Sequence, residues 1–169
     1  MLSIKTTQTN PNYAHDLETV VKALTDKEVV AGFPKGKLNT PHYEFKWSKR
    51  KIRNKEPYPS IIDVAIKNNF GIGVPRREFM AKASEEWEKM ERAALEQVQD
   101  GLAKGQMDVD KFMDVMGQDG ANLISEAIEN CYSPPNSAYT VHMKMSSHPL
   151  IDSGDMKNAP RHEIRRVQK

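Results

Sequence analysis

The side chains in this sequence that could support catalytic or metal chemistry are five histidines and a single cysteine. The histidines are His15, His42, His142, His148 and His162. Their spacing never follows His-x-x-x-His or His-Glu-x-x-His, the patterns that place two metal ligands on one helix face. Cys131 follows Ile124 and Ile128 at helical spacing, which is typical of a small buried side chain. The sequence also lacks a nucleophile elbow and a phosphate-binding glycine loop. We therefore expect a protein that is not an enzyme and that holds no metal or cofactor.

A different chemistry is indicated by residues 34–59, where basic and aromatic side chains are mixed. Between Pro34 and Glu56 there are eight lysines and arginines against two glutamates, a local charge of +6. The basic side chains that we single out are Lys46, Lys49, Arg50, Lys51, Arg53 and Lys55, and the aromatic ones are Tyr43, Phe45, Trp47 and Tyr58. This composition suits a surface that follows a nucleic-acid backbone and stacks its bases. It also suits a loop that docks onto an acidic protein, or a solvated hairpin whose aromatic side chains fold back.

A second basic cluster lies near the end of the chain and contains Arg161, Arg165 and Arg166. Together with the basic side chains of residues 34–59, these arginines are our candidate contacts to a partner or to DNA in a channel. The net charge of the whole chain is only +2, which is small for a dedicated nucleic-acid binder. Docking to protein is therefore slightly favoured over binding to nucleic acid.

Length and composition predict a single domain over residues 1–169. The chain has 169 residues, of which 38% are hydrophobic and 28% charged, so the core is modest. No apolar run is long enough to span a membrane, and the N-terminal residues do not resemble a secretory signal. We expect a soluble protein that is made in the cytoplasm. One cysteine excludes an internal disulfide.

The periodicity of apolar residues predicts the elements that position these side chains. A short helix over 16–24 is followed by a strand over 27–33. Ser60 is the expected cap of a second helix, which ends near residues 68–71. The best-defined element is a long helix from Phe79 to Val98, with apolar residues on one face, ending at Gly101 or Gly105.

Beyond the long helix the predicted elements are less regular. A third helical region starts near Asp108, is interrupted at residues 117–120 and resumes through Ile128. Loops follow, and Ile164 and Val167 indicate a last short strand. The predicted fold class is α+β: a small antiparallel sheet packed against one long and one or two shorter helices, with long extended loops. We interpret residues 34–59 as a loop or hairpin insertion and residues 145–169 as an extended C-terminal segment.

The order of several short motifs resembles the neck or tail-completion proteins of long-tailed bacteriophages, also called minor tail or virion morphogenesis proteins. The motifs are Asn68-Asn69-Phe70-Gly71 at a helix end, Val74-Pro75-Arg76-Arg77-Glu78-Phe79 at the entry to the long helix, Met116-Gly117 as a step before a further helix, Pro134-Pro135 with Thr140 and Lys144, and Pro149-Leu150-Ile151-Asp152-Ser153-Gly154 in a closing loop. The strand at 30–33 fits the opening strand of that family. The resemblance covers about two thirds of the chain. Asn69, Arg76 and Glu78 depart from the family pattern.

This resemblance implies a structural role and not a catalytic one. It implies a virion protein at the neck or the top of the tail, present in the host cytoplasm during assembly. Its implied partners are other copies in a ring of six-fold symmetry, the connector or neck proteins, the tail-tube proteins and DNA in the channel, with no membrane. Whether the protein is a tail terminator, a stopper or a connecting layer stays open. The alternative is a small nucleic-acid-binding protein that uses the basic residues 35–55. In the implied architecture Pro75 starts the long helix, and Gly71 and Gly73 permit a tight turn before it.

Overall fold

The computed structural model describes residues 12–33, 59–105 and 108–167. The elements in chain order are α1 (Tyr13–Asp26), β1 (Lys27–Gly32), α2 (Ile61–Phe70), α3 (Phe79–Lys104), α4 (Val109–Glu129), α5 (Ala138–Lys144) and β2 (Arg161–Arg166). The two strands form an antiparallel sheet in which Lys27 lies opposite Arg166 and Gly32 opposite Arg161. The predicted α+β class is therefore confirmed, including the strands at 27–33 and near residue 164.

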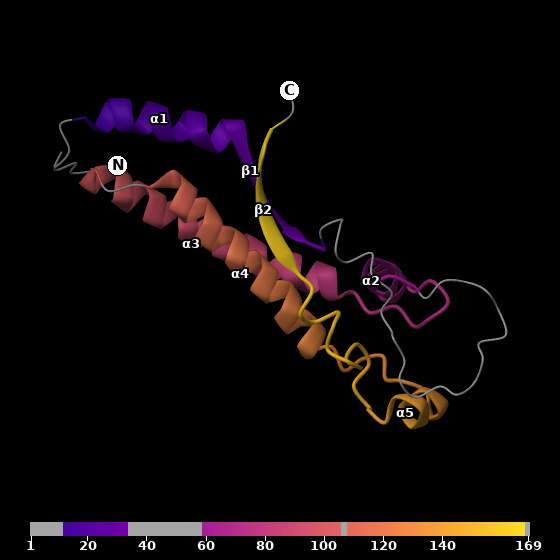
Figure 1. Cartoon of the computed structure of the whole chain (residues 1–169). Helices are drawn as coiled ribbons and strands as arrows, with labels where there is room; N and C mark the ends of the chain where they lie inside the picture. The colour runs from indigo at the N-terminus through magenta and orange to yellow at the C-terminus, as the bar shows by residue number, and fades with distance from the viewer. Residues whose placement is uncertain (1–11, 34–58, 106–107, 168–169) are drawn as a thin grey trace.

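The long axis of the molecule is formed by α3 and α4, which lie side by side (Figure 1). The sheet packs mainly on α4, and α1 lies on the same side of the helix pair as the sheet. At the other end of the axis, α2 and α5 sit near the beginning of α3 and the end of α4. Two strands alone are marginally stable, so the sheet depends on its contact with α4.

The main core lies where α2, α3 and α4 meet the irregular segment that precedes β2. Its fully buried side chains are Phe79, Ile128 and Cys131, so Cys131 is the buried residue that its spacing predicts. Leu150, Met156 and Ala159 belong to the same cluster, so the segment from Leu150 to Ala159 contributes to the core before the chain enters β2. A smaller cluster of Val20 and Val98, with partly buried neighbours, joins α1 to the helix pair.

The apolar face predicted for the long helix is confirmed. Phe79, Ala83, Ala94 and Val98 are buried, and Trp87 is half-buried. The helix runs past Gly101 and ends at Lys104, because Gly105 takes a positive φ of 65°. A glycine adopts this left-handed conformation without a steric penalty, which explains why the second of the two predicted end points is right.

The predicted interruption at residues 117–120 is wrong, because α4 continues from Val109 to Glu129. The Met116-Gly117 step of the resemblance is therefore not a boundary between helices. Glycine within a helix costs about 1 kcal/mol, which is why the sequence indicates a break. Here Gly117 and Gly120 are buried, and a Cβ atom would overlap the ring of His162 at Gly117 and that of Trp87 at Gly120. These glycines let β2 and α3 approach α4 closely.

The start predicted for the long helix at Phe79 is confirmed, whereas the start at Pro75 is wrong, because α3 begins at Phe79. Residues 75–78 are held outside the helix by a hydrogen bond from the backbone N–H of Arg77 to the carbonyl of Asn68, at 2.8 Å. Gly71 and Gly73 do take positive φ values of 74° and 73°, as the predicted tight turn requires. The turn between the two helices is thus longer than the proline alone suggests.

Residues 138–144, which the sequence analysis leaves as loop, form the short helix α5. Ser137 caps this helix, because its hydroxyl accepts a hydrogen bond from the backbone N–H of Thr140 at 3.2 Å. No residue of α5 is buried, so burial in the core does not hold this helix. The cap and the neighbouring segments maintain the helix instead.

Candidate assembly surface

The α2–α3 junction, which we define as residues 68–79, contains a buried arginine. Arg77 is 4% exposed and is the one buried charged residue among those the structure describes. Its Nη1 donates to Asn68 Oδ1 at 2.9 Å, its Nε donates to the Pro134 carbonyl at 3.0 Å, and its Nη2 donates to Asn136 Oδ1 at 3.2 Å. All these acceptors are neutral. The guanidinium therefore ties the end of α2 to the loop that leads into α5.

The asparagines of the helix-end motif have structural roles at this junction. Asn68 accepts from Arg77, and its own Nδ2 donates to the Val64 carbonyl at 2.9 Å. Asn69 Oδ1 accepts from the backbone N–H of Met80 at 3.1 Å and so satisfies a free donor in the first turn of α3. Gly71 ends α2 in the left-handed conformation, and its N–H bonds the Lys67 carbonyl. The motif thus orients α2 relative to α3.

A second basic side chain, Lys144 of α5, lies in the same region. Its Nζ donates to the carbonyls of His148 and Pro149 at 3.1 and 3.3 Å, and Asn136 Nδ2 donates to the same His148 carbonyl. Burial lowers the pKa of Lys144, and the charge of Arg77 lowers it further. Burial likewise lowers the pKa of Arg77. Removing the two cations from water costs free energy. Their charge-assisted hydrogen bonds offset this cost and hold the neighbouring loops together.

α2 itself begins with a reciprocal cap. Ser60 Oγ accepts from the Asp63 N–H at 3.1 Å, and Asp63 Oδ2 accepts from the Ser60 hydroxyl at 2.7 Å and the Ser60 N–H at 2.9 Å. The two hydrogen bonds that the Asp63 carboxyl accepts lower its pKa, and the bond from the Ser60 hydroxyl has the larger effect. The cap predicted at Ser60 is confirmed and has the form of a capping box.

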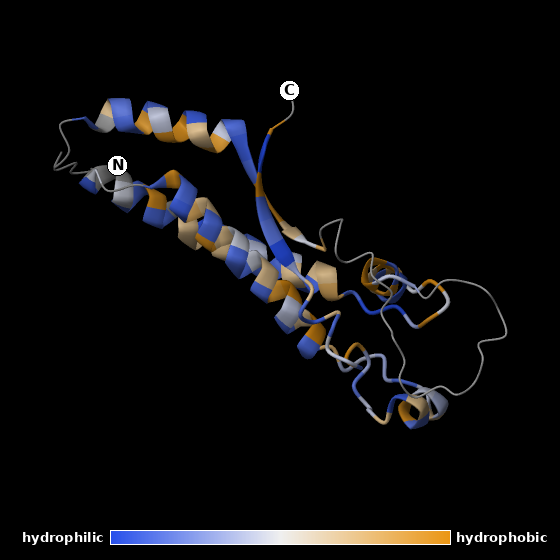
Figure 2. Ribbon diagram, in the orientation of Figure 1, coloured by the Kyte–Doolittle hydropathy of each residue, from blue (hydrophilic) through white to orange (hydrophobic). Residues whose placement is uncertain are grey.

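Two exposed apolar patches flank the junction. The α2 patch consists of Ile66, Phe70, Ile72 and Val74, whose exposed fractions are 43%, 63%, 54% and 38%. The α5 patch consists of Tyr132, Tyr139, Met143 and Met145, of which Met145 is 85% exposed. Figure 2 shows hydrophobic residues on both helices at this end of the molecule. These exposed apolar side chains are the ones that we consider below as candidates for contact with another subunit.

The structure brings most of the singled-out motif residues together. Phe70, Gly71, Pro75, Arg76 and Phe79 belong to the α2–α3 junction, with Phe79 in the core. Pro149 is buried, and its carbonyl accepts a hydrogen bond from Lys144 Nζ. Gly154 lies in a turn of the same segment, with φ 88°.

Gly117 does not join this group, because it lies under β2. The sequence motifs include Arg77 and Lys144 but do not predict their burial, because burial of a charged side chain leaves no local signal in a sequence. Asn136, which bonds Arg77, is absent from the predicted residues.

The C-terminal arginines are divided between the two faces of the sheet. His162 points to α4, because its Nε2 lies 2.9 Å from Asp114 Oδ1, so Arg166 shares that face and Arg161 and Arg165 lie on the other. Arg161 Nη1 donates to the Asn158 and Pro160 carbonyls, and Arg165 forms an ion pair with Glu163. The singled-out basic residues from Lys46 to Lys55 lie outside the described residues.

Three further observations on the described residues concern metal binding, the cysteine thiol and membrane spans. Among them, no group of three or more histidine, cysteine or acidic side chains is placed to hold a metal ion. Cys131 is buried, with its thiol directed at the Ser133 carbonyl at 3.7 Å. No helix in the described ranges is both long and apolar enough to cross a membrane.

Comparison with known proteins found no matching family model, no similar curated protein and no similar solved structure. The function must therefore be inferred from the residues themselves.

Proposed function

We propose that this protein is a structural subunit of a tailed bacteriophage particle and acts at the neck, in head–tail joining or tail completion. Its copies form a ring, six-fold as in the family that the motifs resemble. The ring contacts connector or neck proteins and tail-tube proteins, and it surrounds the channel through which DNA passes. The protein is made in the host cytoplasm and remains in the virion.

The observation that carries this proposal is the α2–α3 junction. Three motif residues from two distant parts of the chain, Asn68, Pro134 and Pro135, meet there at the buried guanidinium of Arg77. The α2 patch and the α5 patch lie on the two segments that Arg77 ties together. A ring needs two different contact surfaces on every subunit, because each heterologous contact repeats around the axis. Two apolar patches held in a constant relative position supply such a pair of surfaces.

The decisive experiment places a stop codon in this gene in its source phage and examines the lysate by electron microscopy. DNA-filled heads beside separate tails are expected if the protein joins the two. Over-long tails assign it to tail termination, which also supports the proposal. Normal infectious particles contradict it, and salt-dependent DNA binding by the purified protein would then become the leading hypothesis.

The role of the basic residues between 34 and 59 is tested by complementing the stop mutant. A variant with Arg50, Lys51 and Arg53 changed to Glu is expected to fold normally and to leave heads and tails unjoined. The matched control changes Lys82, Arg92 and Lys104, all exposed on α3, to Glu. Joining by the first variant at the level of the control refutes this role.

A further inference from the structure

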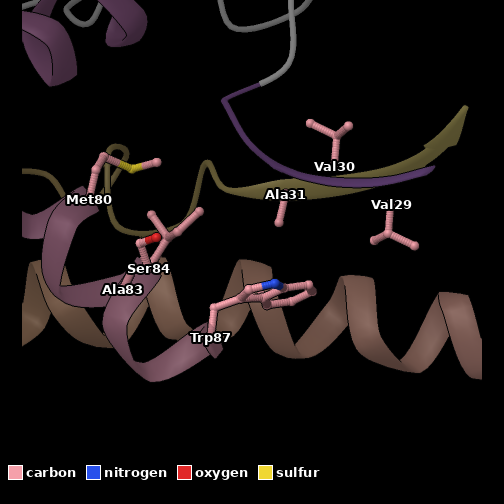
Figure 3. Close-up of a pocket in the computed structure, with 9 residues that line it drawn as sticks. Val29, Val30, Ala31, Met80, Ala83, Ser84 and Trp87 are labelled. Atoms are coloured by element: carbon pink, nitrogen blue, oxygen red, sulfur yellow. The ribbon is translucent and has the colours of Figure 1, made fainter. Parts of the chain in front are cut away.

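An apolar groove runs beside β1 on the side away from β2. It is lined by Val29 and Ala31 of the strand and by Met80, Ala83, Ser84 and Trp87 of α3, with α4 behind (Figure 3). Its volume is about 280 Å³. A cavity of about 150 Å³ holds a benzene molecule, so the groove has room for one or two aromatic rings.

The edge of β1 along this groove has free backbone groups. Val167 N donates to the Asp26 carbonyl, so in this register the residues hydrogen-bonded to β2 are Glu28, Val30 and Gly32. The N–H and C=O groups of Val29 and Ala31 therefore point away from β2. They have no backbone partner among the described residues. An open edge beside an apolar groove is the arrangement that accepts an extended segment as an added strand.

The side chains of such a segment must alternate, since every second one faces the groove. Residues 43–47 of this chain read Tyr-Glu-Phe-Lys-Trp, with three aromatic side chains at alternate positions and two charged ones between them. This pattern is that of a strand with one apolar and one polar face. The side chains of Val29 and Ala31 both point toward α4, so an added strand in register would turn one set of its side chains toward Trp87 (Figure 3).

The connections of the chain allow this pairing within one molecule. The described chain leaves β1 at Phe33, whose ring contacts that of Phe79 with the centroids 6.3 Å apart, and it resumes at Pro59. Nine residues separate Phe33 from Tyr43, which is enough for a hairpin connection. The eleven residues from 48 to 58 can span about 36 Å, more than the roughly 20 Å length of a six-residue strand.

We propose that the groove beside β1 is the docking site for residues 43–47 of the same chain. These residues add to β1 as a third antiparallel strand and turn their aromatic face toward the groove, which accommodates one or two of the three rings. Backbone bonds to Val29 and Ala31 provide the pairing, and Met80, Ala83 and Trp87 provide the apolar contact. The inference is independent of the proposed function, because it concerns contacts within one subunit.

Photo-crosslinking of the full chain identifies the occupant. A benzophenone side chain replaces Ser84, which is exposed and lines the groove, and a control carries it at Gln99, exposed on the same helix. After irradiation of dilute protein, mass spectrometry is expected to find a link from position 84 to residues 43–47 within one chain, and no such link from position 99. A link to another segment, a link between two chains or the absence of any link overturns the proposal.

Tryptophan fluorescence provides a second measurement, since Trp47 and Trp87 are the two tryptophans of the chain. The Trp87→Phe variant, once its circular dichroism spectrum is shown to match that of the wild type, contains Trp47 as its one tryptophan. Trp47 is expected to emit at the shorter wavelength of an indole that is shielded from water. Adding Ser84→Arg blocks the groove and shifts this emission to the red, with several-fold stronger quenching by acrylamide, whereas Gln99→Arg adds the same charge without effect. Emission typical of an exposed indole in all three proteins contradicts the docking.

Discussion

Arg77 joins two segments that lie far apart in the chain, the end of α2 and the loop before α5. It is almost fully buried, yet it faces only neutral acceptors: a side-chain amide at Asn68, another at Asn136 and the carbonyl of Pro134. Hydrogen bonds from a charged donor are roughly twice as strong as neutral ones, which offsets the cost of taking the guanidinium out of water. Its neighbour Arg76 is 62% exposed and pairs with Glu78 at the surface, 2.5 Å away.

These two adjacent arginines permit a matched comparison. Arg77→Met is expected to lower the free energy of unfolding by about 3 kcal/mol, because it leaves several buried acceptors without a donor. Arg76→Met is expected to change it by less than about 1 kcal/mol, since exposed ion pairs contribute little. Urea denaturation followed by circular dichroism measures both. Equal effects of the two substitutions would show that Arg77 does not hold the junction.

Among the elements, the contact between α4 and β2 depends on one residue that lacks a side chain. Gly117 lies against the ring of His162, which also contacts Asp114 one turn earlier in α4. Lys27 of β1 pairs with Asp110, a further turn toward the start of α4. The strand pair is therefore held on one stripe of the helix by polar contacts at one end and by glycine at the other.

A methyl group at Gly117 tests this packing. Gly117→Ala is expected to lower the free energy of unfolding by about 1–3 kcal/mol, because the added Cβ forces β2 away from α4 and this outweighs the better helix propensity of alanine. Gly32→Ala on β1 is the control, since no atom lies within 4 Å of its added Cβ. Thermal and urea unfolding measure both variants, and an increase in stability for Gly117→Ala would disprove close packing at this site.

The capping box of α2 predicts a dependence on pH. The pKa of Asp63 is lower in the folded protein than in the unfolded chain, where it is about 3.9. Its contribution to stability is therefore complete above this value and is lost as the pH falls through the folded pKa. Asp63→Asn is expected to be less stable than the wild type at pH 6, with a difference that shrinks below about pH 4.

Ser60→Ala removes the other half of the cap. It is expected to cost about 1 kcal/mol of unfolding free energy. Unfolding by urea at a series of pH values measures both variants. A difference between wild type and Asp63→Asn that stays constant from pH 6 to pH 2 would mean that this carboxyl does not act through the cap.

At the scale of the whole molecule, the α2 and α5 patches lie at the end of the α3–α4 pair opposite to α1 (Figure 1). Phe70 is the most exposed member of the α2 patch, at 63%, and it ends its helix without entering the core. Its exposure gains nothing for folding. In the proposed ring, this exposed side chain would contact another subunit or a partner protein.

Phe70→Ser separates this role from folding. The variant is expected to unfold at nearly the same urea concentration as the wild type and to fail in complementing the stop mutant, with heads and tails left apart. Val115→Ser is the matched control, because Val115 is 51% exposed on α4 outside both patches. Full complementation by Phe70→Ser would exclude the α2 patch as an assembly contact.

The sequence by itself determined the parts of this protein that depend on near neighbours in the chain. The apolar face of α3, the strand at 27–33 and the Ser60 cap follow from spacings of one to four residues, and the structure contains all three. The position of Gly105 likewise marks the helix end, because a positive φ is a local property of the backbone.

Only the tertiary structure decided the features that join distant segments. The sequence predicts a helix break at Gly117, but in the structure this glycine packs against His162, 45 positions later in the chain. In the sequence, Arg77 is one basic residue among many. In the structure, the loop that contains Pro134 and Asn136 covers it and accepts its hydrogen bonds. The physical reason is the same in both cases. A buried contact between residues far apart in the chain can outweigh a local preference of about 1 kcal/mol, and no local pattern records such a contact.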